Sequence, residues 1–402
     1  MREKVPPDAP APAPGRSDYL VLARKWRPRT FDALIGQDHV ARPLKNALTS
    51  GRLPQAFLFS GIRGVGKTTL ARLLASCLDC ARGPTPEPCG QCDHCRQIAS
   101  GSHPDVMEID AASHTGVEAM RGVLDVVSYM PASARFKVYV LDEVHMLSTS
   151  AFNAMLKTLE EPPAHVKFIF ATTEVGKVLP TILSRCQRYT LRRVPRDLLE
   201  AHLRHVLDQE RVIHDAEGLA LVARAADGSV RDALSLVDQM IVSGGGQVLG
   251  QTVRRQLGLS DRSALIDLLI TVMNADAPGV LTQLTRLHEQ GSYPETVVAE
   301  LLELVHALVQ DRVLGAPAAD SERQRLFQAG TAVTAESLHM LYQGLLAGLP
   351  GVQQAPDRMA ALEMLLLRLL HLRPVPSIER LLAALESRGA AGVAPAAEKK
   401  NP

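Results

Sequence analysis

Aromatic residues are scarce in this 402-residue chain, at 4% of positions, and neither sign of charge predominates. The 44 Lys and Arg side chains oppose 43 Asp and Glu, which leaves a formal net charge of +1 and excludes a uniformly basic nucleic-acid coat. No uninterrupted apolar run approaches the roughly 18 residues of a membrane-spanning helix. The amino terminus also lacks the apolar core of an export signal. We therefore expect a cytoplasmic protein with no membrane partner.

The chain does contain enough apolar material to fold, because hydrophobic residues make up 46% of it. At roughly 100 to 200 residues per domain, its length predicts two to four domains, each able to bury a core. The exceptions are residues 1–18 and 389–402, which are rich in Pro and Ala and have too little apolar surface to offset the entropy of ordering. Both terminal segments are predicted to be disordered.

Residues 19–190 alternate short apolar runs with amphipathic segments, the pattern of an α/β domain built on a parallel sheet. Buried strands are predicted at residues 56–60, 106–109, 138–141 and 166–171. Residues 68–78 and 150–159 carry apolar side chains at helical spacing, and the simplest role of those side chains is core packing.

The strand-like runs stop after Val194. We assign residues 191–257 to a small helical domain, with helices predicted at 195–212, 217–226 and 230–242. A second all-helical domain follows over residues 258–388, with helices predicted near 263–274, 278–290, 294–314, 334–349 and 356–372. Several of these segments begin with Pro, which is favoured in the first turn of a helix.

Residues 61–68 (GIRGVGKT) match the phosphate-loop pattern G-x-x-x-x-G-K-[ST] and lie between a predicted strand and a predicted helix, as the motif requires. Its glycines let successive backbone N–H groups face one phosphate chain at the positive end of the helix dipole. We expect Lys67 to reach the β- and γ-phosphates of ATP and the Thr68 hydroxyl to coordinate Mg²⁺. The predicted nucleotide-binding residues of this segment are Gly61, Ile62, Arg63, Gly64, Val65, Gly66, Lys67, Thr68 and Thr69.

Two adjacent carboxylates, Asp142 and Glu143, follow the strand predicted at 138–141. The carboxyl ends of parallel strands border the crevice where α/β sheets bind ligands. We expect Asp142 to hold the magnesium ion through its water shell and Glu143 to polarise an attacking water. Acidic pairs also occur at ordinary strand ends, so the signal becomes specific only in combination with the phosphate loop.

Five of the six cysteines fall within 19 positions, and closely spaced thiols in a reducing cytoplasm are more often metal ligands than disulfides. A closed, structural Zn²⁺ site needs four ligands, and the predicted set is Cys80, Cys89, Cys92 and Cys95. A set with Cys77 in place of Cys89 competes with it. Helical periodicity argues against that set, because Cys77 shares a face with Leu70 and Leu73, where a thiol behaves as a small buried hydrophobe.

Three other side chains of metal-binding type are not needed for the zinc site. His94 and His103 are near enough in sequence to ligate a metal, but four thiolates already complete the coordination. Cys186 lies about 90 positions away and is expected to pack in the core.

Further motifs resemble those of one family, the gamma/tau subunits of the bacterial DNA polymerase III clamp loader. The resemblance covers about residues 19–374 and rests on residues 19–28 (YLVLARKWRP), 36–37 (GQ), 61–68, 142–145 (DEVH), 156–163 (LKTLEEPP), 184–186 (SRC) and 228–232 (GSVRD). It implies an AAA+ fold: a RecA-like ATPase domain over residues 19–190 with a zinc module at 77–96, a helical lid over 191–257 and a helical collar over 258–388. It also favours Cys80, Cys89, Cys92 and Cys95 as the zinc ligands.

The resemblance also implies roles that spacing alone does not assign. Arg185 resembles the arginine finger that reaches the ATP site of a neighbouring subunit, and Arg231 resembles the lid sensor of the γ-phosphate. Thr173 resembles the polar sensor beside Glu143, with Thr172 as its close rival. The residues similar to those that line the adenine and ribose pocket are Ala23, Arg27, Pro28 and Ile35.

Clamp-loader function implies contact with primer–template DNA through its backbone, and a local strip of positive charge is compatible with the near-neutral total. The candidate helix is residues 115–127, with Arg121 as the expected phosphate contact. Family members often carry further basic residues where this chain has His114 and Gly116.

We interpret the chain as an ATPase subunit of this clamp loader, with ATP, Mg²⁺ and Zn²⁺ as cofactors. The expected partners are delta-type and delta-prime-type subunits, further copies of the chain in a ring, the sliding clamp and primer–template DNA. Because the chain stops at Pro402, it resembles the short gamma-like form or a truncated one. The alternatives are another AAA+ motor, such as a branch-migration ATPase, and a non-hydrolysing loader subunit. The intact Lys67, Thr68, Asp142 and Glu143 oppose the second alternative.

Overall fold

The computed structural model describes residues 20–113, 116–315 and 321–371. The chain divides into two compact units, residues 1–253 and 254–402. The terminal segments predicted to be disordered, 1–18 and 389–402, lie outside the described residues, as does His114. Among the described helices none is both long and apolar enough to span a bilayer.

The first unit is built on a five-stranded parallel sheet in the order β2-β3-β4-β1-β5. Its strands are β1 (Ala56–Ser60), β2 (Val106–Asp110), β3 (Lys137–Asp142), β4 (Val166–Thr172) and β5 (Gln187–Thr190). The four predicted strands are all present. Three of them, β1, β3 and β4, are almost wholly buried, and their apolar sequences made them predictable. Strand β5 was not predicted: it pairs only with β1, at the sheet edge, and just one of its residues, Tyr189, is buried.

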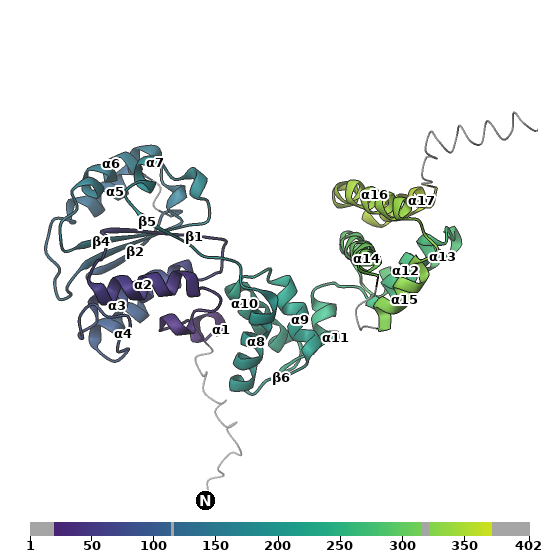
Figure 1. Ribbon diagram of the computed structural model, residues 1–402, viewed down its shortest axis with the longest axis horizontal. Coiled ribbons are helices and arrows are strands. Elements are labelled where there is room, and N and C mark those ends of the chain that lie inside the picture. Colours follow the sequence, from purple (N-terminus) through teal and green to yellow (C-terminus); the bar gives the residue numbers. More distant parts are fainter. Residues whose placement is uncertain (1–19, 114–115, 316–320, 372–402) are drawn as a thin grey trace, which may run out of the picture. The chain divides into compact units, whose positions relative to one another are not determined.

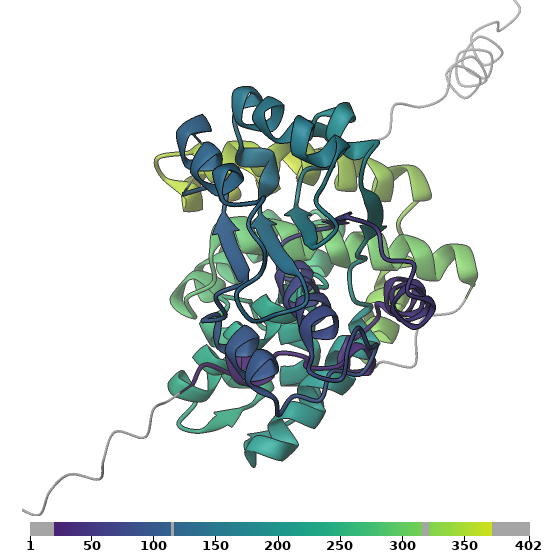
Figure 2. The same ribbon diagram turned by 90° about the vertical axis from the view of Figure 1, so that its left-hand side faces the viewer.

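Helices cover both faces of this sheet (Figures 1 and 2). On one face lie α2 (Asp38–Ser50), α3 (Lys67–Asp79) and α4 (Asp93–Ser100), and on the other lie α5 (Val117–Asp125), α6 (Thr149–Glu160) and α7 (Pro180–Leu183). Each face has its own apolar core: Phe57 and Phe59 of β1 point into the first, and Leu58 points into the second. Because successive side chains of β1 point to opposite faces, the sheet packs between two layers of helices.

A smaller helical part completes the first unit, with α8 (Arg196–Glu210), α9 (Ala216–Ala225) and α10 (Val230–Ser243). The expectation that strands stop after Val194 is wrong, because β6 (Ile213–His214) and β7 (Gln247–Val248) form a small parallel pair here. Two-residue strands are too short to give a periodic signal. The short helix α1 (Leu22–Lys25), which begins the described chain, lies against α10 (Figure 1).

The second unit is all helical in its described part. Helix α11 (Gly250–Gln256) leads into it, and α12 (Arg262–Met273), α13 (Ala277–Glu289), α14 (Pro294–Leu314), α15 (Ser321–Gly330), α16 (Ala335–Gln354) and α17 (Arg358–Leu370) follow. Helix α14 packs against α12, α15, α16 and α17, and residues such as Val298, Leu301 and Val305 along it are buried. The five helices predicted for this region are present, and α15 is an addition.

Candidate nucleotide site and cysteine cluster

The phosphate loop leaves β1 and enters α3 through three glycines with positive φ: Gly61 at +146°, Gly64 at +79° and Gly66 at +106°. A Cβ on Gly61 would lie 2.6 Å from the carbonyl oxygen of Leu191. A Cβ on Gly64 would lie 1.9 Å from the Ser229 hydroxyl, at the start of α10. Both the backbone conformation and the close neighbours therefore require glycine at residues 61 and 64.

The loop is also bonded to the lid helix, because the backbone N–H of Arg231 donates to the Gly64 carbonyl at 3.1 Å. Arg231 is exposed at the first turn of α10, so its side chain is brought to the edge of the loop. Within the loop Val65 is buried in the core, whereas Arg63 is exposed and Thr68 and Thr69 are half-buried.

Lys67 begins α3 and is only 5% exposed. Its Nζ donates to the carbonyl oxygens of Gly61 and Ile62, both at 3.0 Å, and lies 4.0 Å from Glu143 Oε1. Burial lowers the pKa of Lys67, and the carboxylates of Glu143 and Asp142 oppose that shift. The ammonium group is thus held within the phosphate loop by two of the loop's own carbonyls.

Thr68 and Asp142 form the part of the site suited to a divalent cation. Thr68 Oγ1 donates to Asp142 Oδ2 at 2.5 Å, while Asp142 Oδ1 accepts from the backbone N–H of Glu143 at 2.9 Å. A hydroxyl and a carboxylate side by side at the carboxyl end of β3 are the oxygen ligands that Mg²⁺ prefers. The donor set therefore fits magnesium.

Glu143 follows β3 with φ +47°, in the left-handed region, and its carboxylate faces the end of β4. Thr173 donates to Glu143 Oε2 through both its backbone N–H, at 3.1 Å, and its hydroxyl, at 3.0 Å. The rival Thr172 is fully buried, and its Oγ1 lies 3.1 Å from His145 Nδ1. Of the two threonines only Thr173 contacts Glu143.

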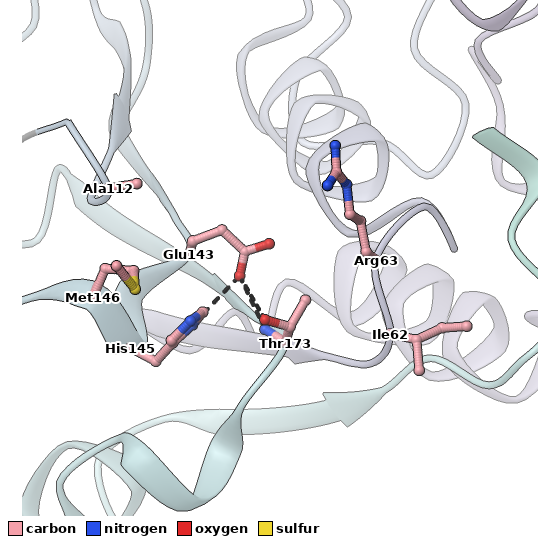
Figure 3. A pocket seen from close by; sticks show the side chains of 7 residues that line it. All are labelled: Ile62, Arg63, Ala112, Glu143, His145, Met146 and Thr173. Carbon is pink, nitrogen blue, oxygen red and sulfur yellow. Dashed lines mark hydrogen bonds and ion pairs between the residues drawn. The ribbon is translucent and has the colours of Figure 1, made fainter. Parts of the chain in front are cut away.

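An open pocket of about 500 Å³ adjoins these groups, and Figure 3 shows its lining: Ile62, Arg63, Ala112, Glu143, His145, Met146 and Thr173. His145 belongs to the motif at 142–145 but was assigned no role from the sequence; its side chain is 7% exposed and its Nδ1 lies 3.4 Å from Glu143 Oε2. The available signal was its position, because His145 is a polar residue two positions after Glu143. Glu143 and residues 62–63 of the phosphate loop thus line the same pocket.

The residues expected around the base do not line this pocket. Four half-buried residues of the segment that precedes α2 make up this set: Ala23, Arg27, Pro28 and Ile35. Burial lowers the pKa of Arg27, and the nearby charges of Arg72, Arg231 and Arg24 lower it further against the opposing effect of Glu108. Positive charge is therefore concentrated around Arg27, beside the phosphate-loop helix.

Arg185 lies apart from this group. It follows α7, and its guanidinium bonds to Glu160 Oε1 at 2.5 Å and to the Thr181 carbonyl at 2.7 Å. None of its contacts in the described structure is with the phosphate loop or with Glu143. Cys186, next to it, packs against the core beneath α6, and burial raises the pKa of its thiol to about 12.

The cysteine cluster follows α3 directly. The sulfur atoms of Cys80, Cys89, Cys92 and Cys95 all lie within 4.8 Å of one another. Backbone N–H groups within the cluster point at its sulfurs, from Cys89 to Cys80 and from Cys92 to Cys89, both at 3.4 Å. Two such donors, from Cys92 and Gln91, lower the pKa of the Cys89 thiol to about 6. Burial raises the pKa of the Cys95 thiol. Four convergent sulfurs match the ligand set of a closed zinc site.

The neighbouring candidates lie outside that set. Cys77 is fully buried with Leu70 and Leu73 in the core above the sheet, and burial raises the pKa of its thiol. His94 Nδ1 and His103 Nε2 are hydrogen-bonded to each other at 2.8 Å. The candidate DNA contact, Arg121, is exposed on α5, and Gly116 is the residue that precedes this helix.

Three family models match successive parts of the chain. Residues 36–195 match the model described as DNA polymerase III, delta subunit; residues 198–246 match the clamp loader ATPase lid domain; residues 248–385 match gamma and tau domain III. The gamma subunit of Buchnera aphidicola subsp. Baizongia pistaciae is 37% identical, over 89% of this chain and 99% of its own length. This chain belongs to the gamma/tau family of DNA polymerase III subunits. The predicted family and AAA+ fold are thereby confirmed.

Other gamma/tau relatives are longer than this chain. The tau subunit of Salmonella typhimurium is 48% identical over 89% of this chain but 56% of its own length, and that of Escherichia coli is 47% identical with the same coverage. The chain thus spans about half the length of these tau subunits. The RuvB branch-migration motor of Thermotoga maritima aligns with this gamma/tau-family chain at 18% identity, over 76% of this chain and 91% of that one, with a TM-score of 0.43.

Proposed function

We propose that the chain is an ATPase subunit of the bacterial replicative clamp loader and acts in the cytoplasm. In this proposal ATP binding lets the assembly hold an open sliding clamp, and primer–template DNA triggers hydrolysis and release. The observation that carries the proposal is the convergence of Lys67, the Thr68–Asp142 pair and the Glu143–Thr173 pair on one phosphate loop. An intact set of this kind supports catalysis rather than a purely structural role.

The site residues have separate proposed roles. The backbone N–H groups of residues 61–68 and Lys67 bind the β- and γ-phosphates, which orients the terminal phosphoryl group. Thr68 and Asp142 hold Mg²⁺, which when bound neutralises charge on the phosphate oxygens. Glu143 accepts a hydrogen bond from the attacking water, and Thr173 holds its carboxylate in place from the end of β4.

The remaining nucleotide contacts are proposed to come from outside the core of the domain. Arg231 is positioned at the loop edge by its backbone bond to Gly64, which supports its role as the lid sensor. Arg185 is proposed to act on the ATP of a neighbouring subunit, because its own contacts lie on α6 and α7. Ala23, Arg27, Pro28 and Ile35 are proposed to border the base and ribose. Cys80, Cys89, Cys92 and Cys95 hold a structural Zn²⁺, which fixes the segment that follows α3.

The proposed domain roles and partners follow the family. Residues 19–190 form the ATPase domain, 191–257 the lid and 258–388 the collar that joins subunits in a ring. The partners are delta-type and delta-prime-type subunits, further copies of the chain, the sliding clamp and primer–template DNA. Arg121, exposed on α5, is proposed to contact the DNA backbone.

The deciding experiment measures ATP turnover by the assembled loader with and without its sliding clamp and primed DNA. We expect clamp and DNA together to stimulate turnover and clamp to become topologically linked to the DNA. A loader containing Glu143→Gln in this chain should bind ATP and clamp without turnover. Stimulation by branched DNA alone, with no effect of the clamp, would instead indicate a branch-migration motor. Normal loading by the Glu143→Gln protein would indicate a non-hydrolysing subunit.

A further inference from the structure

Helix α1 is capped by a residue from a distant part of the chain. Its N-cap residue, Val21, provides no side-chain hydrogen bond, and the first helical N–H, that of Leu22, donates instead to Asp238 Oδ2 at 2.8 Å. Asp238 lies 216 positions later, in lid helix α10, and is 9% exposed. A carboxylate at the amino end of a helix satisfies a free N–H and matches the sign of the helix dipole.

The other end of α1 is held by a second lid carboxylate. Glu210, at the end of α8, accepts a hydrogen bond from the indole Nε1 of Trp26 at 2.7 Å and one from Lys25 Nζ at 2.7 Å. The Trp26 ring also meets His205 of α8 edge to face, with centroids 5.8 Å apart. Both ends of α1 are therefore attached to the lid, and the attachment extends as far as Trp26.

Arg27 is the next residue, and its guanidinium has no hydrogen-bond or ion-pair partner among the described residues. It is half-buried, and the charges of Arg24, Arg72, Arg231 and Glu108 act on it. Glu108 is the one carboxylate of these four, and it is already paired with Arg72 at 2.7 and 2.9 Å. Four arginines thus share one carboxylate, and the half-buried guanidinium of Arg27 is left without an anion of its own. A bound nucleotide, whose base and ribose Arg27 is proposed to border, carries negative charge that would balance this arginine.

We propose that Asp238 and Glu210 are positioning residues that hold Arg27 at the nucleotide through α1. Arg27 then belongs mechanically to the lid, like Arg231, although it precedes the ATPase domain in sequence. The lid contributes two arginines to the bound nucleotide, and movement of the lid carries both. This inference rests on the proposed nucleotide site.

The test is a double-mutant cycle for ATP affinity in the full-length chain, with Glu210→Ala, Arg27→Ala and the double variant. If Glu210 acts through Arg27, each single variant should weaken binding of a fluorescent ATP analogue by about tenfold, and the double variant should be no weaker than Arg27→Ala. Glu210→Gln keeps an acceptor for Trp26 and should recover most of the affinity. Asp238→Asn, which keeps an acceptor for Leu22, should likewise bind more tightly than Asp238→Ala.

The matched control is Asp215→Ala, which removes a different lid carboxylate that caps α9 through Gly218 at 2.6 Å. It should lower the melting temperature and leave ATP affinity of the folded protein unchanged. Additive losses in the cycle, or an equal loss of affinity in Asp215→Ala, would overturn the positioning role and leave the ATPase proposal standing. Absence of saturable ATP binding by the unaltered chain would overturn both.

Discussion

The guanidinium of Arg185 is bonded to the carboxylate of Glu160 on its own subunit, with Nη2 2.5 Å from Oε1. Both side chains are substantially exposed, at 32% and 52%, and an ion pair this exposed contributes only about 0 to 1 kcal/mol. The pair therefore orients the arginine without retaining it strongly. A phosphate presented by a neighbouring subunit has enough negative charge to compete with Glu160.

Arg185→Ala should slow ATP hydrolysis by about 1,000-fold in the assembled loader while leaving ATP affinity nearly unchanged, because the arginine is proposed to act in a neighbour's site. The measurement pairs single-turnover hydrolysis with equilibrium nucleotide binding. Lys177→Ala, which alters another exposed ion pair, is the control. An equal loss of ATP affinity in Arg185→Ala would contradict the assignment in trans.

Lys67→Ala should abolish measurable ATP binding, a loss of about 100-fold or more, because the only ammonium group bonded to the phosphate loop is removed from the described site. Equilibrium dialysis with labelled ATP measures the loss. A circular dichroism melt establishes that the variant is folded. Retention of ATP affinity would show that the loop of this chain does not hold the nucleotide.

Thr173→Val should reduce turnover by about tenfold to 100-fold with little change in ATP affinity, because Glu143 loses one of its two Thr173 hydrogen bonds. Thr172→Val is the matched substitution on the preceding residue, whose hydroxyl contacts His145 rather than Glu143. Its effect on turnover should be smaller. The reverse order of effects would make Thr172 the sensor.

Cys89→Ser should lower the zinc content from about one ion per chain and reduce the melting temperature, because a closed site needs all four thiolates. Cys77→Ala should keep its zinc and lose only packing energy in the core, about 1 to 2 kcal/mol. Metal analysis of both proteins after dialysis separates the two roles. Loss of zinc from Cys77→Ala with retention in Cys89→Ser would support the rival ligand set.

The contact between α1 and the lid should weaken in acid. The hydrogen bond from Lys25, and then that from Trp26, hold the pKa of Glu210 below its ordinary value, with burial opposing them. A lowered folded-state pKa contributes stability that is present above the ordinary glutamate pKa and is lost as the pH falls through the lowered value. Melting temperatures measured from pH 7 down to pH 3 should fall more steeply in the unaltered chain than in Glu210→Gln. Parallel curves would count against this contact.

Local sequence patterns were sufficient to predict an element or a motif where one continuous segment contains all the residues that define it. Strand β4 is buried along its full length, so its apolar run identified it, and the phosphate loop is a continuous motif. Helix boundaries differ from the predictions by one or two residues in most cases and by more at the end of α16. Strand β5 escaped detection because its exposed residues outnumber its single buried one.

Contacts between remote segments could not be found in this way. The N–H of Leu22 and the carboxylate of Asp238 are 216 positions apart, and nothing near either residue indicates the other. The same holds for Gly64 and Ser229. One lies in the phosphate loop and the other at the start of α10, and only the folded chain brings them together. The candidate-site residues other than His145 can be assigned from the sequence, but only the structure shows which of them meet.

Helix α3 has a mechanical consequence for the two candidate sites. It starts at Lys67 and ends at Asp79, immediately before Cys80, so one helix of 13 residues, about 20 Å long, has the phosphate loop at one end and the first cysteine of the candidate zinc site at the other. If the Cys80 end of α3 is held by a bound metal, the orientation of the N–H groups at the Lys67 end is fixed as well. Oxidation of the four thiols should therefore change the orientation of the N–H groups in the proposed triphosphate site.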